Sequence, residues 1–594
     1  MTKLYRTDHR LITKRIIVRG TLVLDTPTCL GTGDADSPTD LPLLRDSLDD
    51  KYALLTGSSI AGAFRNYLRE QNKGYGESDR RYDSAALLFG DLFSYKDEQN
   101  ITDEVEKIKL REQDTQSPLI IDDAISTKPI QSELRDGVKI DSITRTAEDK
   151  KKYDLELLQA GTEFPLCFEL LIETEDIKIT LIKVITVEKQ LAETSSLPTF
   201  FFKWLAYRYK NQATLLKSLA ITLSGLEAKN DAKSGEISLG MKKRRGFGRC
   251  HVKEWQVWNF DLTDASDRIA WLTLDHSWLT DPPCTKSPAI DSSIVAAMKK
   301  AGLDVPEDWE DKRDRFTIQA TFKLVSSLLI RSGQAETGRA PDVVHLKSYR
   351  IINQQIKWLF DRAIQILGEL PSEIDLWSSE NLELFFFAHN LLKAKVLTSV
   401  LSGTSLAGVL RHRAERIVNT LEKPTTIIDE IFGPDFSQDK TKKAKASRLI
   451  VHESVIENTT ELVQTRIAID RFTGGAYHGA LFQEQPIFAN DNTELKLEIE
   501  LRQPKKHEIG LLLLLLKDLW TEDLPVGGGS SVGRGRLKGK KATMTWKDST
   551  WEIEQNGKDS LKITPESDKE KLEAYVSELA NYLKENNNNE PSHS

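Results

Sequence analysis

The sequence repeats one ordered set of motifs, and this duplication limits what the chain can fold into more than any other feature. Four segments of the first half recur in the second half in the same order, each with several identical residues. The pairs are residues 57–65 and 403–411 (GSSIAGAFR and GTSLAGVLR), 117–125 and 447–455 (SPLIIDDAI and SRLIVHESV), 140–145 and 469–473 (IDSITR and IDRFT), and 239–249 and 526–536 (LGMKKRRGFGR and VGGGSSVGRGR). Because chance does not produce such a series in one order, we predict two versions of a single unit.

Each copy opens with a period-two pattern of apolar residues, in residues 15–24 and 315–324. Such alternation is typical of a half-buried strand, and the glycine-containing turn after each run marks its end. Strand-like runs then alternate with helical stretches such as residues 59–70 and 509–520. We therefore predict an α+β fold with an antiparallel sheet in each copy.

The spacing between equivalent residues is larger for the first pair of segments than for the second, so the second copy must carry an extra segment near its start. We predict a first unit at residues 1–260, a connector with some helix at 261–312, a second unit at 313–550 with a helical insertion at about 349–395, and a C-terminal extension at 551–594. The Asn-rich end of this extension is low in complexity and is predicted to be disordered.

The composition is that of a globular protein. Of the 594 residues, 39% are hydrophobic and 29% are charged, and the net charge of −8 argues against a polycation that coats nucleic acid. The four cysteines are scattered without a CxxC pair, so they indicate neither a disulfide framework nor a structural zinc site. The basic N-terminus has no apolar segment behind it, and no apolar run is long enough to span a bilayer. We expect a cytoplasmic protein without a membrane partner.

The repeated GSS or GTS segment is predicted to start a helix. Ser58 or Ser59 is placed to cap that helix, the unpaired N–H groups at its start attract anions, and Arg65 lies two turns along. The alternative is a helix cap followed by a packing face of small residues. Recurrence in both copies favours contact with nucleic-acid phosphates, and the candidates are Gly57, Ser58, Ser59 and Arg65 in the first copy and Gly403, Thr404, Ser405 and Arg411 in the second.

The glycine-rich loops that close the two copies are strongly basic in a chain that is acidic overall. Glycine allows the backbone to approach a ligand closely, and clustered Arg and Lys neutralise phosphates. A solvated hairpin is the alternative. The candidate RNA-binding residues here are Arg244, Arg245 and Arg249 in the first copy and Arg534 and Arg536 in the second, with Arg145, Arg466 and Arg471 as further candidates in the Arg-bearing stretches before them.

Acidic residues follow the first predicted strand of each copy. Asp34, Asp36 and Asp40 lie in the loop of the first copy, and Asp342 lies in that of the second. Carboxylates in such loops can hold a divalent metal or act on a 2′-hydroxyl group, and either route serves RNA cleavage. A plain acidic surface loop is the commoner explanation, and spacing alone does not decide between them.

Taken together, the ordered motifs resemble the RAMP superfamily, and more closely the backbone subunits of type III CRISPR effector complexes. The resemblance covers most of the chain twice, as in subtype III-D-like systems with fused backbones. It implies two ferredoxin-like, RRM-related domains with inserted thumb elements, here at about residues 127–154 and 457–480. It also implies partners: a CRISPR guide RNA, a target RNA and other type III effector subunits.

In the type III members a loop aspartate cleaves the target RNA at regular intervals with a divalent metal, Mg²⁺ or Mn²⁺. Carried over, this residue falls best on Asp40, with Asp34 and Asp36 as rivals, and on Asp342 in the second copy, where the Val-Val-His that follows departs from the pattern. The resemblance thus implies a metal-dependent endoribonuclease in antiviral defence, with Asp40 and Asp342 as possible metal ligands.

Two other functions are compatible with the same motifs. The chain could position the guide RNA while other subunits cut, or it could process precursor CRISPR RNA alone by His-based acid–base chemistry. His478 and His452 are the candidates for that chemistry, although a lone histidine is usually structural and the first copy has no counterpart. Neither copy has the aromatic signature of a free-standing RRM, so we expect RNA to be held by its shape and backbone.

Overall fold

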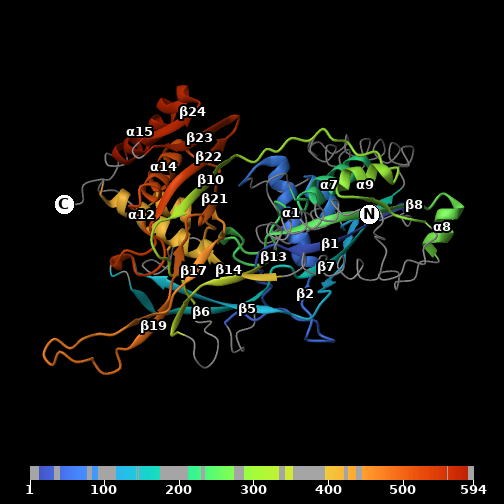
Figure 1. Ribbon diagram of the computed structural model, residues 1–594. Helices are drawn as coiled ribbons and strands as arrows, with labels where there is room; N and C mark the ends of the chain where they lie inside the picture. The colour runs from blue at the N-terminus through green and yellow to red at the C-terminus, as the bar shows by residue number, and fades with distance from the viewer. Residues whose placement is uncertain are drawn as a thin grey trace, which may run out of the picture.

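The computed structural model contains two α+β units that follow each other along the chain (Figure 1). The described residues are 12–32, 40–76, 83–90, 116–141, 144, 146–173, 212–228, 234–272, 286–332, 341–351, 395–420, 426–435, 444–557 and 560–585. Nearly all of the predicted helical insertion, from residue 352 to residue 394, lies outside the described residues, as does the Asn-rich tail from residue 586.

The first unit is built on an antiparallel sheet with the strand order β3-β7-β1-β8, and β9 (Ala289–Asp291) lies at its edge. Its core elements are β1 (Ile12–Leu24), α1 (Gly57–Lys73), β3 (Leu119–Ile121), β7 (Glu163–Glu173), α7 (Gln212–Ser224) and β8 (Cys250–Asp261). Ile16 and Val18 of the central strand β1 belong to one buried cluster with Phe64 of α1 and Leu219 of α7. The two helices therefore pack on the sheet through a shared core.

The second unit repeats this arrangement. Its core elements are β10 (Arg315–Leu324), α12 (Gly403–Thr420), β15 (Leu449–Val451), β21 (Glu494–Arg502), α14 (Lys506–Trp520) and β22 (Leu537–Trp546). β10 pairs antiparallel with β21 and β22, and β15 pairs antiparallel with β21. Phe316 and Phe322 of β10 share a buried cluster with Leu406 of α12 and Leu512 of α14.

Each unit thus has the element order β-α-β-β-α-β, with the first strand between the third and the fourth, which is the ferredoxin-like arrangement. The predicted α+β fold is confirmed. The strands expected at residues 15–24 and 315–324 are β1 and β10, and the helices expected at residues 59–70 and 509–520 are α1 and α14.

A β-hairpin stands between the second and third core strands of each unit; it overlaps the predicted thumb range and extends beyond the end of that range, to residue 158 in the first unit and to residue 489 in the second. In the first unit it consists of β5 (Ser132–Ile140) and β6 (Ala147–Leu158). In the second unit β17 (Thr459–Glu461) pairs with β20 (Ile487–Ala489), and β18 (Gln464–Arg466) pairs with β19 (Phe482–Gln485). Leu158 forms a β-bridge to Thr28, and Ile487 forms one to Leu328. Leu158 and Ile487 are therefore equivalent residues, and they align the first hairpin with the second.

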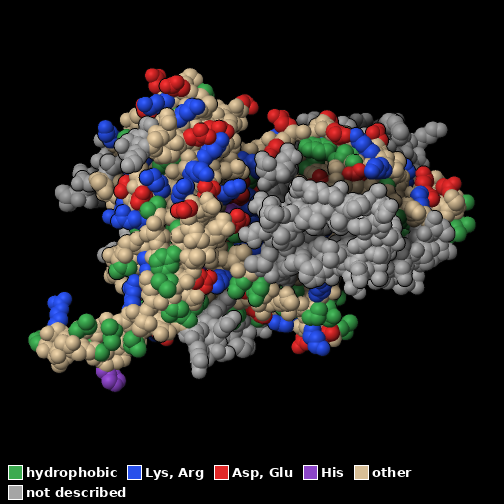
Figure 2. Space-filling view, viewed as in Figure 1, with side chains coloured by type: hydrophobic (Ala, Val, Ile, Leu, Met, Phe, Trp, Pro, Cys, Tyr) green, Lys and Arg blue, Asp and Glu red, His purple; other side chains and the backbone are tan. Residues whose placement is uncertain are grey.

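The tips of the two hairpins differ. In the second unit residues 467–481, here called the finger, project from β19 and extend away from the unit (Figure 1, orange). Apolar side chains gather on the finger (Figure 2), where Phe472 is fully exposed and Ile469 and Leu481 are largely exposed. The hairpin β5–β6 of the first unit instead runs beneath the second unit.

The remaining elements extend the sheets or cover them. They are β2 (Leu54–Leu55), α2 (Ser84–Phe89), β4 (Ala124–Ile125), α8 (Ala265–Leu272), α9 (Ile294–Lys300), β11 (Arg331–Ser332), β12 (Val343–His345), β13 (Lys347–Ile351), β14 (Lys395–Leu401), α13 (Thr426–Phe432), β16 (Ser454–Ile456), β23 (Ser549–Asn556), β24 (Ser560–Thr564) and α15 (Lys569–Glu585). α9 lies in the predicted connector. β23 and β24 lengthen the second sheet, and α15 packs on α14, where a Cβ added at Gly510 would lie 2.2 Å from the Tyr575 carbonyl oxygen.

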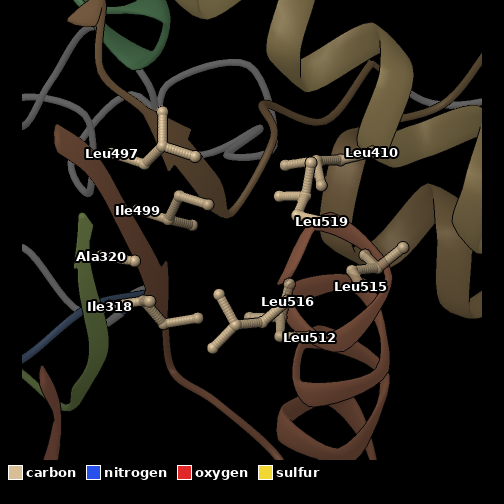
Figure 3. Close-up of a pocket in the computed structure, with 9 residues that line it drawn as sticks. All are labelled: Ile318, Ala320, Leu410, Leu497, Ile499, Leu512, Leu515, Leu516 and Leu519. Carbon is tan, nitrogen blue, oxygen red and sulfur yellow. The ribbon is translucent and has the colours of Figure 1, made fainter. Parts of the chain in front are cut away.

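A small apolar void lies between the sheet and the helices of the second unit (Figure 3). Its lining comes from β10, β21, α12 and α14 and consists of alanine, isoleucine and leucine side chains. Because no polar side chain lines the void, nothing there can orient a polar ligand. We therefore interpret it as part of the hydrophobic core.

Candidate catalytic and RNA-binding sites

Asp40 and Asp342, the two candidate catalytic residues, occupy equivalent places at the bases of the two hairpins. Oδ2 of Asp40 accepts a hydrogen bond from the backbone N–H of Asp154 at 2.8 Å, and Oδ2 of Asp342 accepts one from Gln483 at 2.7 Å. The donors Asp154 and Gln483 are equivalent, because each lies four residues before the residue that bridges to the start of its unit, Leu158 or Ile487. Both aspartates are exposed, so two loops of different sequence present a carboxylate at the same position.

Two lysines contact β6 at and beside Asp154, the residue whose N–H holds Asp40. Nζ of Lys152 is 3.7 Å from the carboxylate of Asp154, and Lys152 remains largely exposed. Lys242, at the start of the first glycine-rich loop, places its Nζ 3.7 Å from the ring centroid of Tyr153. The exposed Lys152 is suited to bind an RNA phosphate on this strand.

At the second site the neighbouring charges serve the hairpin itself. Glu484, next to Gln483 in β19, is buried and pairs with Arg534 at 2.9 Å and with Arg466 at 3.2 Å. Arg534 also donates to the side-chain oxygen of Gln464 at 2.8 Å. Arg534 is itself buried, so its observed contacts hold the base of the hairpin, and RNA binding by Arg534 and Arg466 stays a prediction.

The side chains around Asp40 and Asp342 supply only some of the ligands that a divalent metal needs. Exposed carboxylates are the hard oxygen ligands that Mg²⁺ and Mn²⁺ prefer. However, no group of three or more His, Cys, Asp or Glu side chains suited to a metal occurs among the described residues. Mg²⁺ commonly uses one or two carboxylates and completes its shell with water and substrate phosphates. Asp40 or Asp342 could therefore hold such an ion together with bound RNA. The rivals Asp34 and Asp36 lie outside the described residues.

The helix starts differ from the sequence prediction in one respect, namely which residue caps them. The cap of α1 is Thr56, whose Oγ1 accepts a hydrogen bond from the N–H of Ser59 at 3.3 Å, and not Ser58 or Ser59. In α12 the equivalent residue Ser402 accepts from the N–H of Ser405 at 3.2 Å. The prediction was wrong because the helix begins at the glycine itself, so the capping residue is the one before it.

The recurring arginines Arg65 and Arg411 fasten the following helix in each unit. Nη2 of Arg65 donates to the carbonyl oxygen of Phe89 at the end of α2, at 2.9 Å. Nη1 of Arg411 donates to the carbonyl oxygen of Gly433, just after α13, at 2.6 Å. Both arginines are half-buried, so their recurrence has a structural explanation. RNA binding by either residue stays a prediction.

The first glycine-rich loop lies against the second unit. Arg244 donates to the carbonyl oxygen of Ser447, and Arg245 donates to that of Leu449 at 3.0 Å. Arg249 pairs with Glu498 of β21 at 2.8 Å. Burial, with the nearby charges of Arg244 and Arg411, lowers the pKa of Arg245 to about 10, so this guanidinium remains charged at neutral pH. The cations predicted to meet RNA thus also join the two units.

A buried ionic cluster completes this joint. Arg135 of β5 pairs with Glu133 at 2.9 Å and with Glu453 of the second unit at 2.8 Å, and Arg350 of β13 pairs with the same Glu453. Oγ of Ser348 donates to Glu133 at 3.1 Å. Because every charge in the cluster has a partner of opposite sign, the hairpin of the first unit is fixed to the second unit.

The other candidates are scattered over the described surface or lie outside it. Arg145 is outside the described residues, Arg471 is exposed on the finger, and Arg536 is exposed at the end of the second glycine-rich loop. Gly403 lies within the joint, where a Cβ would be 2.4 Å from the carbonyl oxygen of Arg245, and Thr404 and Ser405 follow it. The structure therefore groups Gly403, Thr404 and Ser405 with the joint and not with Asp40 or Asp342.

Sequence reasoning missed the residues that connect the two halves. The Glu133, Arg135 and Glu453 cluster joins segments far apart in the chain, and neither spacing nor periodicity signals such a contact. The donors to Asp40 and Asp342 could have been found, because the repeat that equates residues 140–145 with residues 469–473 also equates Asp154 with Gln483.

Two ferredoxin-like units in tandem, each with an inserted hairpin and an exposed aspartate at its base, define a class of duplicated α+β proteins. The family model of the RAMP superfamily matches residues 21–251 and again residues 321–538. The chain therefore belongs to the RAMP superfamily and contains two RAMP domains, and membership implies CRISPR-associated RNA binding. A comparison with curated proteins finds no match. Among the described residues, no helix is both long enough and apolar enough to cross a membrane.

Proposed function

We propose that the chain is a double backbone subunit of a type III CRISPR effector complex, which binds a guide RNA and cleaves target RNA at two positions, one for each RAMP domain. The observation that carries this proposal is the equivalence of Asp40 and Asp342, whose carboxylates accept hydrogen bonds from equivalent backbone N–H groups at 2.8 and 2.7 Å. A surface loop without a function has no reason to keep an exposed carboxylate at one position in two diverged copies.

The hairpin backbone orients each carboxylate. The N–H of Asp154 holds Oδ2 of Asp40 and so fixes the orientation of the carboxylate. Oδ1 then remains to accept a proton from a 2′-hydroxyl group or to bind a cation. Lys152, which is exposed on the same strand as Asp154, would provide positive charge for the RNA backbone. A bound Mg²⁺ or Mn²⁺ would supply further neutralisation of that phosphate.

The test replaces each aspartate in the guide-loaded complex by asparagine, which keeps an acceptor for the backbone N–H but removes the charge. We expect Asp40→Asn and Asp342→Asn each to remove one cleavage product, with a loss of about 10²-fold or more in rate at that position, and the double variant to remove both. Target binding should be unchanged. Asp50→Asn, an exposed carboxylate in the same segment as Asp40, is the matched control.

The same experiment separates this function from its alternatives. Complete cleavage by the double variant, with binding intact, would mean that the chain is a scaffold and that another subunit cuts. For stand-alone processing of precursor RNA, His452 is poorly placed, because burial and the nearby charge of Arg249 lower its pKa to about 4 and keep it neutral. His478 is exposed on the finger. We expect the purified chain to leave a precursor transcript uncut.

A further inference from the structure

The segment that follows each candidate aspartate runs along the base of its hairpin. In the first unit Leu41 forms a parallel bridge to Leu155, and the N–H of Glu156 donates to the carbonyl oxygen of Leu41 at 3.2 Å. In the second unit β12, which contains Val343 and Val344, pairs parallel with β19. The position of each carboxylate therefore depends on how firmly this segment is fastened to the hairpin. We call residues 40–45 and 342–347 the aspartate segments.

Glu156 of β6 fastens the first aspartate segment with both of its carboxylate oxygens. Oε2 accepts a hydrogen bond from the N–H of Leu43 at 3.1 Å, and Oε1 accepts one from Nη2 of Arg45 at 2.8 Å. Nη1 of Arg45 donates to the carbonyl oxygen of Asp50 at 3.1 Å. The side chain of Glu156 is largely buried, and it holds the segment three and five residues after Asp40.

The second unit keeps this ion pair although the glutamate is missing. Gln485 stands in place of Glu156, since each lies two residues before the bridging residue of its hairpin. Lys347, the equivalent of Arg45, pairs instead with Glu461 of β17 at 2.6 Å. Nε2 of Gln485 donates to the other carboxylate oxygen of Glu461, also at 2.6 Å. A basic residue of the aspartate segment is thus paired with a hairpin glutamate in both units.

The two glutamates lie on different strands of the hairpin. Glu461 is in register with Ile487, so its equivalent in the first unit is Ser132, which is in register with Leu158. Ser132 is exposed and uncharged. The carboxylate therefore comes from the strand that leaves the hairpin in the first unit and from the strand that enters it in the second.

Stability alone does not explain why both copies keep the ion pair, because partly exposed pairs contribute little to the free energy of unfolding. Between residues 40–45 and 342–347 the copies share only the aspartate, one leucine and the basic character of the last residue. An ion pair that persists through such divergence, with its carboxylate supplied from another strand, indicates that the aspartate segment must be held in place.

We propose that Glu156 and Glu461 are positioning residues, which fix the candidate carboxylates of the two units through Arg45 and Lys347. The proposal rests on the proposed nuclease function. Each glutamate acts through the aspartate segment and takes no part in proton transfer. Because displacement of a reacting group by about 1 Å can slow a reaction about 10²-fold, a loosened segment slows cleavage without weakening the binding of target RNA.

The first test measures the rate of each cleavage product in the guide-loaded complex at saturating target RNA. We expect Glu156→Gln to slow at least about 10-fold only the product that Asp40→Asn removes, and Glu461→Gln to slow only the product that Asp342→Asn removes. The affinity for target RNA should be unchanged. The second product of each variant is its internal control. Full rates for both products in Glu156→Gln and Glu461→Gln, where the aspartate variants abolish them, would overturn the proposal.

The second test exchanges the two arrangements between the units. Glu156→Gln with Ser132→Glu gives the first unit the arrangement of the second, and Glu461→Gln with Gln485→Glu does the converse. We expect each pair of changes to restore most of the lost rate. Gln131→Glu, which adds the same charge at an exposed position one residue away, should not rescue Glu156→Gln. Equal rates with and without the relocated carboxylate would mean that the ion pair does not position the aspartate.

The third test needs neither RNA nor cleavage. In hydrogen exchange on the RNA-free chain, we expect residues 41–45 to exchange about 10-fold faster in Glu156→Gln than in the native chain, and residues 343–347 to be unaffected. The relocated carboxylate at position 132 should restore the native rate. Unchanged exchange in residues 41–45 would overturn the proposal whatever the cleavage rates are. If the aspartate variants leave cleavage intact, the proposed function fails, whereas hydrogen exchange still decides whether Glu156 holds the segment.

Discussion

Glu453 is the residue on which the joint between the units depends most, because Arg135 of the first unit and Arg350 of the second share its buried carboxylate. We expect Glu453→Gln to lower the free energy of unfolding by about 3 kcal/mol, since it leaves two buried guanidinium groups without a full counter-charge. Urea denaturation at pH 7 measures this change. Glu457→Gln, an exposed position in the same segment, should change the free energy by less than about 0.5 kcal/mol.

The pH dependence of that difference provides a second readout. The adjacent charges of Arg135 and Arg350 outweigh burial and hold the pKa of Glu453 below its ordinary value of 4.5. A carboxylate with a depressed pKa contributes stability above its unfolded pKa and loses it as the pH falls through the folded pKa. The difference in the free energy of unfolding between the native chain and Glu453→Gln should therefore be constant from pH 7 to pH 5 and become smaller below about pH 4.5. A gap that widens on acidification would contradict the assignment.

Single residues show where sequence reasoning succeeds and where it stops. Asp40 and Asp342 could be selected because each follows a predicted strand in a repeated unit, and the repeat is visible in the chain itself. The cap at Thr56 was missed because position within a turn depends on where the helix begins, which side-chain type alone does not fix. The partners of Glu453 were missed because they lie more than a hundred residues away in sequence, and no local rule reports them.

The helices following α1 and α12 depend on one arginine each. Arg65 donates to the carbonyl oxygen of Phe89 at 2.9 Å and lies 5.9 Å from the centroid of its ring. Arg65→Ala should therefore lower the free energy of unfolding by about 1 to 3 kcal/mol, because a charge-assisted bond to a half-buried carbonyl is lost. Thermal unfolding measures this loss, and Arg416→Ala, exposed on α12, is the control. Equal effects of the two variants would mean that Arg65 does not hold α2.

Secondary structure was predictable where the apolar period is long. The alternation of residues 315–324 corresponds to β10 residue for residue, and the apolar stripe of residues 509–520 corresponds to α14 with one further turn at its start. The short strands of the second hairpin were not resolved, because runs of three residues such as β17 and β18 have no measurable period. Their pairing is set by β19 and β20, which lie beyond the finger.

At the scale of the whole molecule, duplication and divergence have produced one body with two different ends. The turn Lys243–Arg245 in the glycine-rich loop of the first unit is basic and is used at the joint, while the equivalent turn Ser530–Val532 of the second unit is neutral and exposed. The net charge of −8 is thus a sum over basic and acidic surfaces, and it does not predict the charge of any one surface.

The joint makes a final prediction about cooperativity, for which the duplication supplies a matched pair of variants. Gly246 in the first glycine-rich loop and Gly533 in the second have φ of 89° and 83°, so alanine costs each of them a similar backbone strain of about 1 kcal/mol. Only at Gly246 would the new Cβ meet the other unit, 2.3 Å from the backbone nitrogen of Glu453, whereas at Gly533 nothing lies within 4 Å. In scanning calorimetry we expect one transition for the native chain and for Gly533→Ala, and two transitions for Gly246→Ala, because the units then unfold independently. Identical profiles for the two variants would mean that the first glycine-rich loop does not couple the RAMP domains.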